Sequence, residues 1–555
     1  MIKTIKLKFG KAPNLPSAEI NTTPVTVFVG PNNSGKSKVI SEIHYLCTNG
    51  QLNSRDVILS EIEFDSFTSD MAKKKVGKIT LKPQSHEPIM PENIIIVGKG
   101  GNRNMIDEPT LLSALQNTNS QLNVFCGYYL AFNTLMLDGR NRINLVNQQT
   151  AGDLQQHPHT SFQVLFRDED KRKKVRRIIH DAFGLHFVVD PTHLGILRLR
   201  LSSRPPSTDI EERGIHDEAL QFHSSATLVE EASDGVKAFT GIITEIIAGD
   251  PAVLLIDEPE AFLHPSLAFN LGKEIALTSS ESEKRIFVST HSPNFVMGCI
   301  QSGAPVNIVR LTYRGGIPTA RVLANKDILP LMRNPLLRST GVISGLFYEF
   351  VVVTESDADR AFYQEINERL LRYQPDMGIS NCLFINAQNK QTVKTIIKPL
   401  RELGIPAVGV VDIDILKDGG PVWTGFLESS FVPKLEHQSL ANLRHDIKQK
   451  FEGKNMKRDG GVEILSDGDK EAANNLFDKL AEYGIFAVRR GELESWLPNL
   501  GATGKTPSWL ITVFEKMGED PESADYLMPS NDDVWSFLGE IKKWFTNPTR
   551  KGIPL

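Results

Sequence analysis

The sequence is poor in cysteine and contains no long apolar run. Its cysteines are far apart in the 555 residues and form no CxxC pair or Cys/His cluster; they are Cys47, Cys126, Cys299 and Cys382. Cysteine this sparse fits a reducing compartment and argues against a disulfide framework or a structural zinc site. No stretch of about 18 apolar residues occurs, so we expect no transmembrane helix and no membrane partner. The N-terminal MIKTIKLKFG also lacks the apolar core of a secretory signal, and we therefore expect a cytoplasmic protein.

Neither sign of charge is in large excess. Lys and Arg number 62, Asp and Glu number 67, and the formal charge is −5. This balance excludes a uniformly basic, histone-like binder, although a local basic groove stays open because net charge does not describe distribution. With 40% hydrophobic and 23% charged residues, the composition also excludes a fibrous repeat and a wholly disordered chain. The length predicts about three to five domain-sized units.

A nucleotide-binding loop follows an early apolar segment. Residues 25–29 form a β-branched apolar run typical of a buried parallel strand, and they lead into G-x-x-x-x-G-K-S over 30–37 and then a helical pattern. In this context the pattern predicts a P-loop for ATP. Lys36 would reach the β- and γ-phosphates, Ser37 would offer its hydroxyl to Mg²⁺, and the helix N-terminus would add a positive dipole. The expected nucleotide-binding residues of the loop are Gly30, Asn33, Gly35, Lys36, Ser37 and Lys38.

Two further strand ends complete an ATPase pattern. The apolar run 252–256 ends at Asp257, a second Mg²⁺ ligand, and at Glu258, which can polarise the attacking water as general base. The run 285–290 ends at His291, which can contact the γ-phosphate. Asp-Glu after a strand is a weak signal alone, but together with a P-loop it indicates ATP hydrolysis.

An alternation of strands and helices restarts after residues 333–335. Apolar runs at 350–354, 383–386, 407–411 and 485–488 alternate with helical segments, the first from Arg360 to about Leu371. This order predicts a second parallel α/β domain, so the whole chain is expected to be α/β, with a P-loop ATPase domain first.

Acidic side chains follow three of these strands. Sites in open α/β sheets lie at the carboxyl ends of strands, and hard oxygen ligands gathered there suit Mg²⁺ or Mn²⁺. Two such ions can activate water and stabilise the leaving oxygen during phosphodiester cleavage. Asp357 is an extra carboxylate that competes with Asp359 for the role of ligand. The candidate ligands are Glu355, Asp359, Asp412, Asp414 and Glu494.

The order P-loop, Asp-Glu, Thr-His resembles the ABC-type ATPases of the structural-maintenance and recombination-repair families. Their signature loop precedes the Asp-Glu strand, where this chain has E-A-S-D-G-V-K-A over 231–238. The resemblance implies that Ser233 and Gly235 contact ATP bound by a second protomer, and hence a homodimer or higher homo-oligomer. His264, in E-P-E-A-F-L-H-P, is typical of the nuclease-associated branch. The candidates for the Q-loop glutamine are Gln148, Gln149, Gln155 and Gln156.

The second half resembles the Toprim domain shared by topoisomerases, bacterial primases and the OLD (overcoming lysogenization defect) nucleases. The Glu355-x-x-x-Asp359 spacing, the D-x-D of 412–414 and the G-x-L-E that ends at Glu494 look like the OLD version, with Ser356 in place of the usual Gly. The resemblance implies catalytic roles for Glu355, Asp412 and Asp414. It also implies a C-terminal lysine near the scissile phosphate; Lys505 is the candidate, and an ordinary loop lysine is the alternative.

ATPase followed by Toprim is the order of the OLD family, which the chain resembles over most of its length. The resemblance implies an ATP-binding and ATP-hydrolysing, metal-dependent DNA endonuclease in which ATP governs dimer geometry or substrate loading. Family members often serve in bacterial defence against phage, and some are retron effectors. A reverse transcriptase with its RNA–DNA product, or another defence protein, is therefore a candidate partner.

Three other functions fit parts of the pattern less well. A non-cutting repair or chromosome-organising ATPase would keep the Toprim module only to bind nucleic acid, and it predicts broken acidic motifs, whereas these are complete. A strand-passing topoisomerase needs a tyrosine nucleophile in a winged-helix region, and no such region is evident. A primase would typically add a zinc-binding module, and the widely spaced cysteines argue against one.

The motifs also predict the domain limits. We expect an ATPase domain over 1–335 with inserted material at about 100–220, a linker over 336–345, a Toprim domain over 346–510 with an insertion at about 416–482, and a helical extension over 511–555. The basic run 171–177 is either a solvated helix face or a patch for nucleic-acid phosphates. The polar basic loop around 453–460 either contacts nucleic acid or forms a cap.

Overall fold

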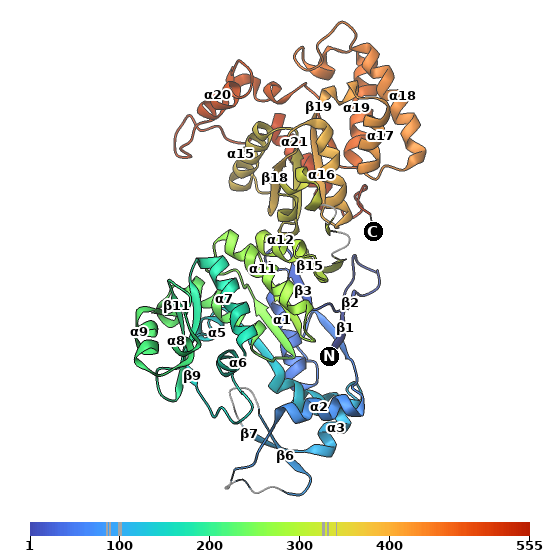
Figure 1. Cartoon of the computed structure of the whole chain (residues 1–555). Helices are drawn as coiled ribbons and strands as arrows, with labels where there is room; N and C mark the ends of the chain where they lie inside the picture. The colour runs from blue at the N-terminus through green and yellow to red at the C-terminus, as the bar shows by residue number, and fades with distance from the viewer. Residues whose placement is uncertain are drawn as a thin grey trace. The chain divides into compact units, whose positions relative to one another are not determined.

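The computed structural model describes residues 1–84, 87, 90–97, 103–324, 328–329, 332–339 and 341–554. The chain divides into two compact units, Met1–Leu329 and Pro330–Leu555 (Figure 1). Each unit combines helices with a largely or wholly parallel sheet, which confirms the expected α/β fold class. Among the described residues, no helix has both the length and the apolar character needed to cross a membrane.

The first unit is built on a six-stranded sheet with β3 (Val25–Val29) in its interior. Every residue of β3 is buried, which is why its sequence is continuously apolar rather than alternating. All neighbouring strands pair in parallel except the last two along the chain, which form an antiparallel hairpin. The spatial order is β16 (Ile317–Ala324), β15 (Val306–Arg314), β3, β14 (Arg285–Ser289), β13 (Val253–Asp257) and β8 (Thr134–Leu137).

Helix α1 (Lys36–Asn49) begins at the end of the P-loop and is anchored by a buried carboxylate. Glu42 accepts the backbone N–H groups of Val57, Ile58 and Leu59 at 2.8, 3.1 and 2.7 Å. Leu59 is the first residue of β4 (Leu59–Phe64), which pairs antiparallel with β1 (Ile2–Leu7). The P-loop helix is therefore tied to a second, antiparallel sheet, whose third strand is β2 (Glu19–Asn21).

The material expected as one insertion at about 100–220 is interrupted by the central sheet. Strand β8 lies within that range and pairs with β13, so a strand of the central sheet divides the inserted material into two parts. The strand has only four residues, too short a run to stand out in the sequence. The flanking segments carry two small antiparallel groups: β5 (Thr80–Leu81), β6 (Asn93–Val97) and β7 (Arg103–Asp107), and then β9 (Gln149–Thr150), β10 (His186–Asp190), β11 (Ile196–Ser202) and β12 (Thr227–Leu228).

Helix α7 (Glu169–Phe183) carries the basic run 171–177, and most of its cations are paired within the unit. Arg172 is buried, and its guanidinium lies 2.7 Å from Glu212 Oε1. The other pairs are Arg176–Glu212, Lys173–Glu169, Lys174–Glu281 and Arg177–Glu274. Because these cations are already paired, we interpret α7 as an ordinary ion-paired helix face rather than a patch for nucleic-acid phosphates.

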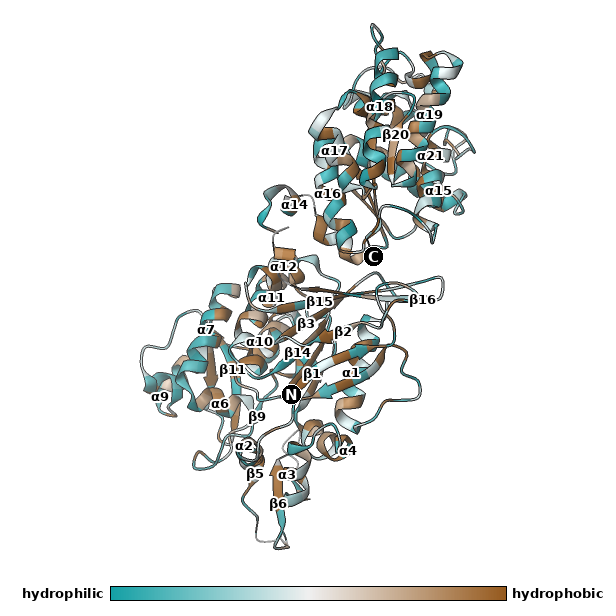
Figure 2. Cartoon of the chain, turned by 90° about the vertical axis from the view of Figure 1, so that its right-hand side faces the viewer, coloured by the Kyte–Doolittle hydropathy of each residue, from teal (hydrophilic) through white to brown (hydrophobic). Residues whose placement is uncertain are grey.

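The second unit contains a four-stranded parallel sheet. Its order is β18 (Cys382–Asn386), β17 (Phe350–Thr354), β19 (Ala407–Asp412) and β20 (Ile485–Val488). These strands coincide with the four apolar runs of the sequence, and Figure 2 shows β20 among them as a hydrophobic ribbon. Helix α16 (Lys390–Glu402) connects β18 to β19, and three α-helices lie between β19 and β20: α17 (Gly420–Ser429), α18 (Lys434–Lys450) and α19 (Asp467–Glu482).

The ends of the second unit differ from expectation. The segment 336–345 was expected as a linker, yet it contains most of α14 (Pro335–Ser339) and the start of a 3₁₀ helix, Val342–Phe347; residue 340 lies outside the described residues. In the segment 511–555, α21 (Asp533–Thr546) places Trp535 and Leu538 in the same core as the strand residues Val352 and Phe486. The C-terminal region is therefore part of the core rather than an appended extension.

Arg401 connects several separate segments of the second unit. Its side chain is fully buried and donates to the carbonyl oxygens of Ala407 at 2.9 Å, Ser430 at 3.1 Å, Gly552 at 3.0 Å and Gly484 at 3.3 Å. One guanidinium thus satisfies carbonyls from β19, the end of α17, the turn before β20 and the C-terminal tail.

We predict that Arg401→Met lowers the free energy of unfolding of the second unit by about 2–4 kcal/mol, because buried carbonyls are left without donors. All five tryptophans of the chain, Trp423, Trp496, Trp509, Trp535 and Trp544, lie in this unit, so tryptophan fluorescence during urea unfolding of the full chain reports on it selectively. Lys398→Met, an exposed position of the same helix, is the matched control. Equal midpoints for the two variants would contradict the role given to Arg401.

Candidate functional site

The P-loop takes the strand–loop–helix form that its sequence predicts. Gly30 follows β3 with φ 149°, and a Cβ atom there would lie 2.0 Å from the carbonyl oxygen of Leu311, so no other residue fits. Asn33 and Gly35 also have positive φ, of 60° and 95°, and α1 begins at the next residue. The loop therefore has the alternating backbone that turns N–H groups toward one side, as anion binding requires.

Lys36 lies folded against its own loop. Its ammonium donates to the carbonyl oxygens of Gly30 at 2.9 Å and Pro31 at 2.8 Å. Burial lowers the pKa of Lys36 to about 8, against the opposing effect of the carboxylates of Glu258, Asp257 and Glu260. Ser37 is exposed at the start of α1, and the ammonium of Lys38 lies 3.7 Å from Glu42 Oε1.

The ends of β13 and β14 bring the other predicted ATPase residues together. Ser289 donates its hydroxyl to the carboxylate of Asp257. His291 Nε2 lies 3.4 Å from Glu258 Oε1, and burial together with the nearby Lys36 charge lowers the pKa of His291. Glu258 has the positive φ of 52°, which is unusual for a residue with a side chain. The predicted base and the predicted γ-phosphate contact are therefore neighbours, although they are 33 positions apart in sequence.

Two residues of this site were not predicted from the sequence. Glu260 accepts the backbone N–H of His291 at 2.7 Å, and burial raises its pKa. Arg142, just after β8, is 2% exposed and donates to the carbonyl oxygens of Asp257, at 2.9 Å, and Glu258. Arg142 therefore holds the backbone turn that contains the strained residue Glu258. The E-P-E motif at 258–260 could have indicated Glu260 as a site residue. Nothing in the local sequence distinguishes Arg142 from Arg140.

The proposed signature loop lies beside the segment that follows Glu258. Ser233 is the N-cap of α10 (Asp234–Ile247), and Gly235 packs against the backbone of Phe262. The four candidate Q-loop glutamines have contacts of other kinds: Gln148 bonds Glu230, Gln149 bonds Phe162, Gln155 and Gln156 bond Asp153. In the described part of the chain, Arg142 donates to the Asp257–Glu258 turn and none of these glutamines does.

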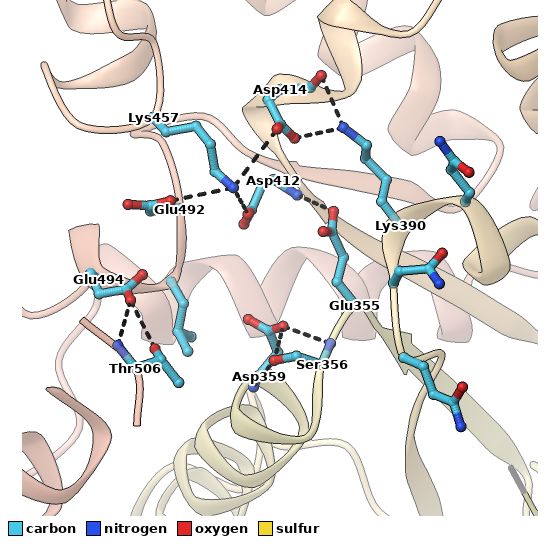
Figure 3. A pocket seen from close by; sticks show the side chains of 14 residues that line it. Glu355, Ser356, Asp359, Lys390, Asp412, Asp414, Lys457, Glu492, Glu494 and Thr506 are labelled. Carbon is cyan, nitrogen blue, oxygen red and sulfur yellow. Dashed lines mark hydrogen bonds and ion pairs between the residues drawn. The ribbon is translucent and has the colours of Figure 1, made fainter. Parts of the chain in front are cut away.

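The acidic residues of the second unit converge at the carboxyl edge of its sheet (Figure 3). Glu355 follows β17, Asp412 ends β19, and Asp414 lies one turn further on. Glu355 Oε1 accepts the backbone N–H of Asp412 at 2.9 Å, and one carboxylate oxygen from each of the three residues lies within 4.8 Å of the others. They line a pocket of about 690 Å³.

Asp359 and Glu494 line the same pocket from another side. Asp359 forms a capping box with Ser356, whose N–H and hydroxyl donate to Asp359 Oδ2 at 2.9 and 2.7 Å. This cap starts α15 (Asp357–Tyr373) three residues earlier than the sequence pattern indicated. Glu494 Oε1 accepts from the N–H and hydroxyl of Thr506 at 3.0 and 2.8 Å.

Asp357 takes no part in the pocket lining. Its carboxylate, 69% exposed, lies 2.7 Å from Arg360 Nε and accepts from Asn386 Nδ2 at 3.3 Å. Asp359 is thus the better candidate ligand of the two.

Lys505 is exposed in the loop before α20 (Ser508–Met517), and it is the neighbouring Thr506 that lines the pocket. Two other lysines reach the carboxylates directly. Lys390 Nζ lies 2.8 Å from Asp414 Oδ1 and 3.3 Å from Asp418 Oδ2. Lys457 Nζ lies 2.7 Å from Asp412 Oδ2, 3.8 Å from Asp414 Oδ2 and 3.3 Å from Glu492 Oε2. Sequence reasoning missed Lys390, Lys457 and Glu492 as site residues, although Lys457 belongs to the basic loop noted around 453–460.

The electrostatics of the pocket favour a bound cation. Burial raises the pKa of Glu355, and the charges of Asp412 and Asp414 raise it further. Burial likewise raises the pKa of Asp412, although its hydrogen bond to Lys457 acts in the opposite direction. Carboxylates gathered this closely, with all-oxygen donors, fit Mg²⁺ or Mn²⁺. The residues that would hold the ion are Glu355, Asp412 and Asp414, and Asp359 and Glu494 line the same pocket.

The chain is similar to known proteins in both units. Residues 174–297 match the family model described as "AAA domain, putative AbiEii toxin, Type IV TA system", and residues 346–414 match "Overcoming lysogenization defect protein-like, TOPRIM domain". Old nuclease of Escherichia phage P2 is 23% identical over 312 residues, which are 48% of this chain and 49% of that protein. The match thus spans about half the length of the relative.

Two solved structures of SMC head domains are also similar to part of the chain. An SMC head bound to the C-terminal winged-helix domain of ScpA is 14% identical, with a TM-score of 0.32, over 58% of this chain and 97% of that one. The SMC head domain from Thermotoga maritima is 15% identical, with a TM-score of 0.29, over 58% of this chain and 98% of that one.

We predict that Asp412→Asn weakens Mn²⁺ binding at least about tenfold, whereas Asp357→Asn changes it by less than about twofold, because Asp412 belongs to the converging oxygen cluster and Asp357 pairs with Arg360 outside it. Titration calorimetry of the full chain without nucleotide measures both. Equal effects of the two substitutions would show that the ion binds elsewhere.

Proposed function

We propose that this chain, an ATPase–Toprim protein of the OLD type, is an ATP-regulated, divalent-metal-dependent DNA endonuclease. The observation that carries the proposal is the convergence of Glu355, Asp412 and Asp414, whose carboxylate oxygens lie within 4.8 Å of one another in an open pocket. The Toprim match and the likeness to Old nuclease support a nuclease role for that pocket.

In this proposal the carboxylates bind Mg²⁺ or Mn²⁺, and the bound ions supply an activated water and charge stabilisation for phosphodiester cleavage. The chain's own groups position those ligands. Asp412 presents its N–H to Glu355, Lys390 holds Asp414, and Ser356 fixes Asp359 through the capping box. A non-cutting ATPase that used its Toprim module only to bind nucleic acid would not need these positioned carboxylates. Their presence therefore favours a nuclease function.

The ATPase unit would act through dimer formation. In the proposal Lys36, Ser37 and Asp257 bind MgATP, Glu258 activates the attacking water, His291 contacts the γ-phosphate, and Ser233 and Gly235 close on the nucleotide of a second protomer. The 3.4 Å approach of His291 to Glu258 supports a shared role of these two side chains. Arg142 is a positioning residue in this scheme, because it holds the carbonyls on either side of the Asp257–Glu258 peptide.

The biological part of the proposal is defence of a bacterial cytoplasm against bacteriophage. A trigger or partner, such as a reverse transcriptase with its RNA–DNA product or another defence protein, would control cutting. This part rests on the family resemblance alone.

We predict that the purified chain nicks or linearises supercoiled plasmid with Mg²⁺ or Mn²⁺, and that EDTA abolishes cutting. Glu355→Gln and Asp414→Asn should slow cutting by about two orders of magnitude or more, because each removes a charged metal ligand. Asp357→Asn is the matched control, since it removes a neighbouring carboxylate outside the pocket and should retain activity. Cutting by the ligand variants at the wild-type rate would refute the nuclease assignment.

We predict that ATP increases the mass of the Glu258→Gln variant from monomer to dimer, measured by light scattering after gel filtration, because this variant binds ATP without hydrolysing it. Ser233→Arg should block that increase while leaving nucleotide binding intact, and Lys36→Ala should prevent both. A mass that is independent of ATP in every variant would exclude nucleotide-controlled dimer formation.

A further inference from the structure

Lys457 occupies a central position among the acidic residues of the second unit (Figure 3). Its ammonium contacts Asp412 at 2.7 Å, Glu492 at 3.3 Å and Asp414 at 3.8 Å. The side chain is 26% exposed, so the ammonium lies partly out of water among partners of one charge sign. Two of these partners, Asp412 and Asp414, are also members of the converging oxygen cluster.

The loop that carries Lys457 is fixed on the edge of the sheet. A Cβ atom at Gly491, whose φ is 137°, would lie 2.1 Å from the carbonyl oxygen of Lys457, so the two backbones are in direct contact. The carbonyl of Gly491 accepts the N–H of Ile413 at 3.0 Å, and the N–H of Val462 donates to Arg489 at 2.9 Å. The backbone of Lys457 is thereby held next to both the D-x-D segment and Glu492, and its long side chain is the movable part.

Lys390 differs from Lys457 in its partners. Its ammonium bonds the side chain and carbonyl of Asp414 at 2.8 and 3.2 Å and also lies 3.3 Å from Asp418, which is outside the pocket lining. Lys390 thus bonds one carboxylate oxygen of Asp414, Oδ1. Lys457 instead contacts the other oxygen of Asp414 together with Asp412, so it bonds two of the three carboxylates that form the converging oxygen cluster.

An ammonium and a divalent ion cannot both occupy the same carboxylate oxygens. Each unit of positive charge placed among several carboxylates lowers their mutual repulsion, so the lysine and the metal offer the pocket the same kind of stabilisation. The lysine is always present at high local concentration, because its backbone is anchored at the site.

We propose that Lys457 is a built-in cation that competes with the divalent metal for Asp412 and its neighbours, so that metal loading must displace its ammonium. The competition sets how much free metal the nuclease pocket needs before it fills. This inference rests on the proposed metal-dependent function of the pocket.

The test is Mn²⁺ binding to the full chain without DNA or nucleotide, measured by titration calorimetry. Lys457→Met should bind Mn²⁺ at least tenfold more tightly than wild type, because the internal competitor is gone. Lys457→Arg keeps the charge and should stay within about threefold of wild type. Lys454→Met is the matched control, since Lys454 lies on the same loop, is exposed, and its ammonium bonds the carbonyl oxygen of Ile464.

A second readout is independent of cleavage and guards against misfolding. Without metal, Lys457→Met should unfold at a lower temperature than wild type, followed by tryptophan fluorescence, because its carboxylates lose their counter-ion. Saturating Mn²⁺ should raise its midpoint more than that of wild type. A metal-free midpoint equal to wild type, or a smaller rise, would count against the inference.

The outcomes separate this inference from the proposed function. If wild type binds Mn²⁺ and Lys457→Met binds it equally or more weakly, the competition is refuted and the metal site remains. If no variant binds Mn²⁺, both the inference and the proposed metal site fail. If Lys457→Met binds Mn²⁺ more tightly but no protein cuts DNA, the competition stands and the nuclease assignment fails.

Discussion

Six carboxylates meet in one pocket of the second unit, and their mutual repulsion is the constraint around which the surrounding structure is arranged. The parallel sheet imposes it, because the carboxyl ends of β17, β19 and β20 lie at one edge and each is followed by acidic residues. The fold compensates in three ways: with the ammonium groups of Lys390 and Lys457, with backbone N–H donors such as that of Asp412, and with hydroxyl donors from Ser356 and Thr506. A set of groups balanced this way is well suited to exchanging one cation for another.

The ATPase unit also gathers carboxylates in a small space, but its cations have different partners. Asp257, Glu258 and Glu260 lie close together at and just after the carboxyl end of β13, and Lys36 and Arg142 lie among them. Arg142 bonds carbonyl oxygens rather than carboxylates, so it stabilises a strained turn while leaving the acidic groups available. In both units, therefore, carboxylates lie close together at the end of a parallel sheet. Lysine and arginine side chains from other segments of the chain stabilise them.

The features that the sequence revealed are those carried by contiguous residues. The P-loop, the Asp-Glu strand end, the D-x-D and all four strands of the second sheet were visible because a short run contains both the element and its chemistry. Long-range features were hidden: β8 is only four residues long, Arg142 is one of two nearby arginines, and Lys457 reaches Asp412 across 45 positions. The choice between Asp357 and Asp359 depended on one capping box, since the cap turns Asp359 inward and leaves Asp357 to Arg360.

The placement of Lys457 on a loop between β19 and β20, rather than on a strand, has an evolutionary consequence. Residues at the sheet edge take part in strand pairing, whereas a loop residue can be exchanged without altering that pairing. Selection can therefore adjust the ion requirement of such a pocket by altering the loop alone. Related chains with the same acidic residues but different loops would then be matched to different concentrations of free metal ion.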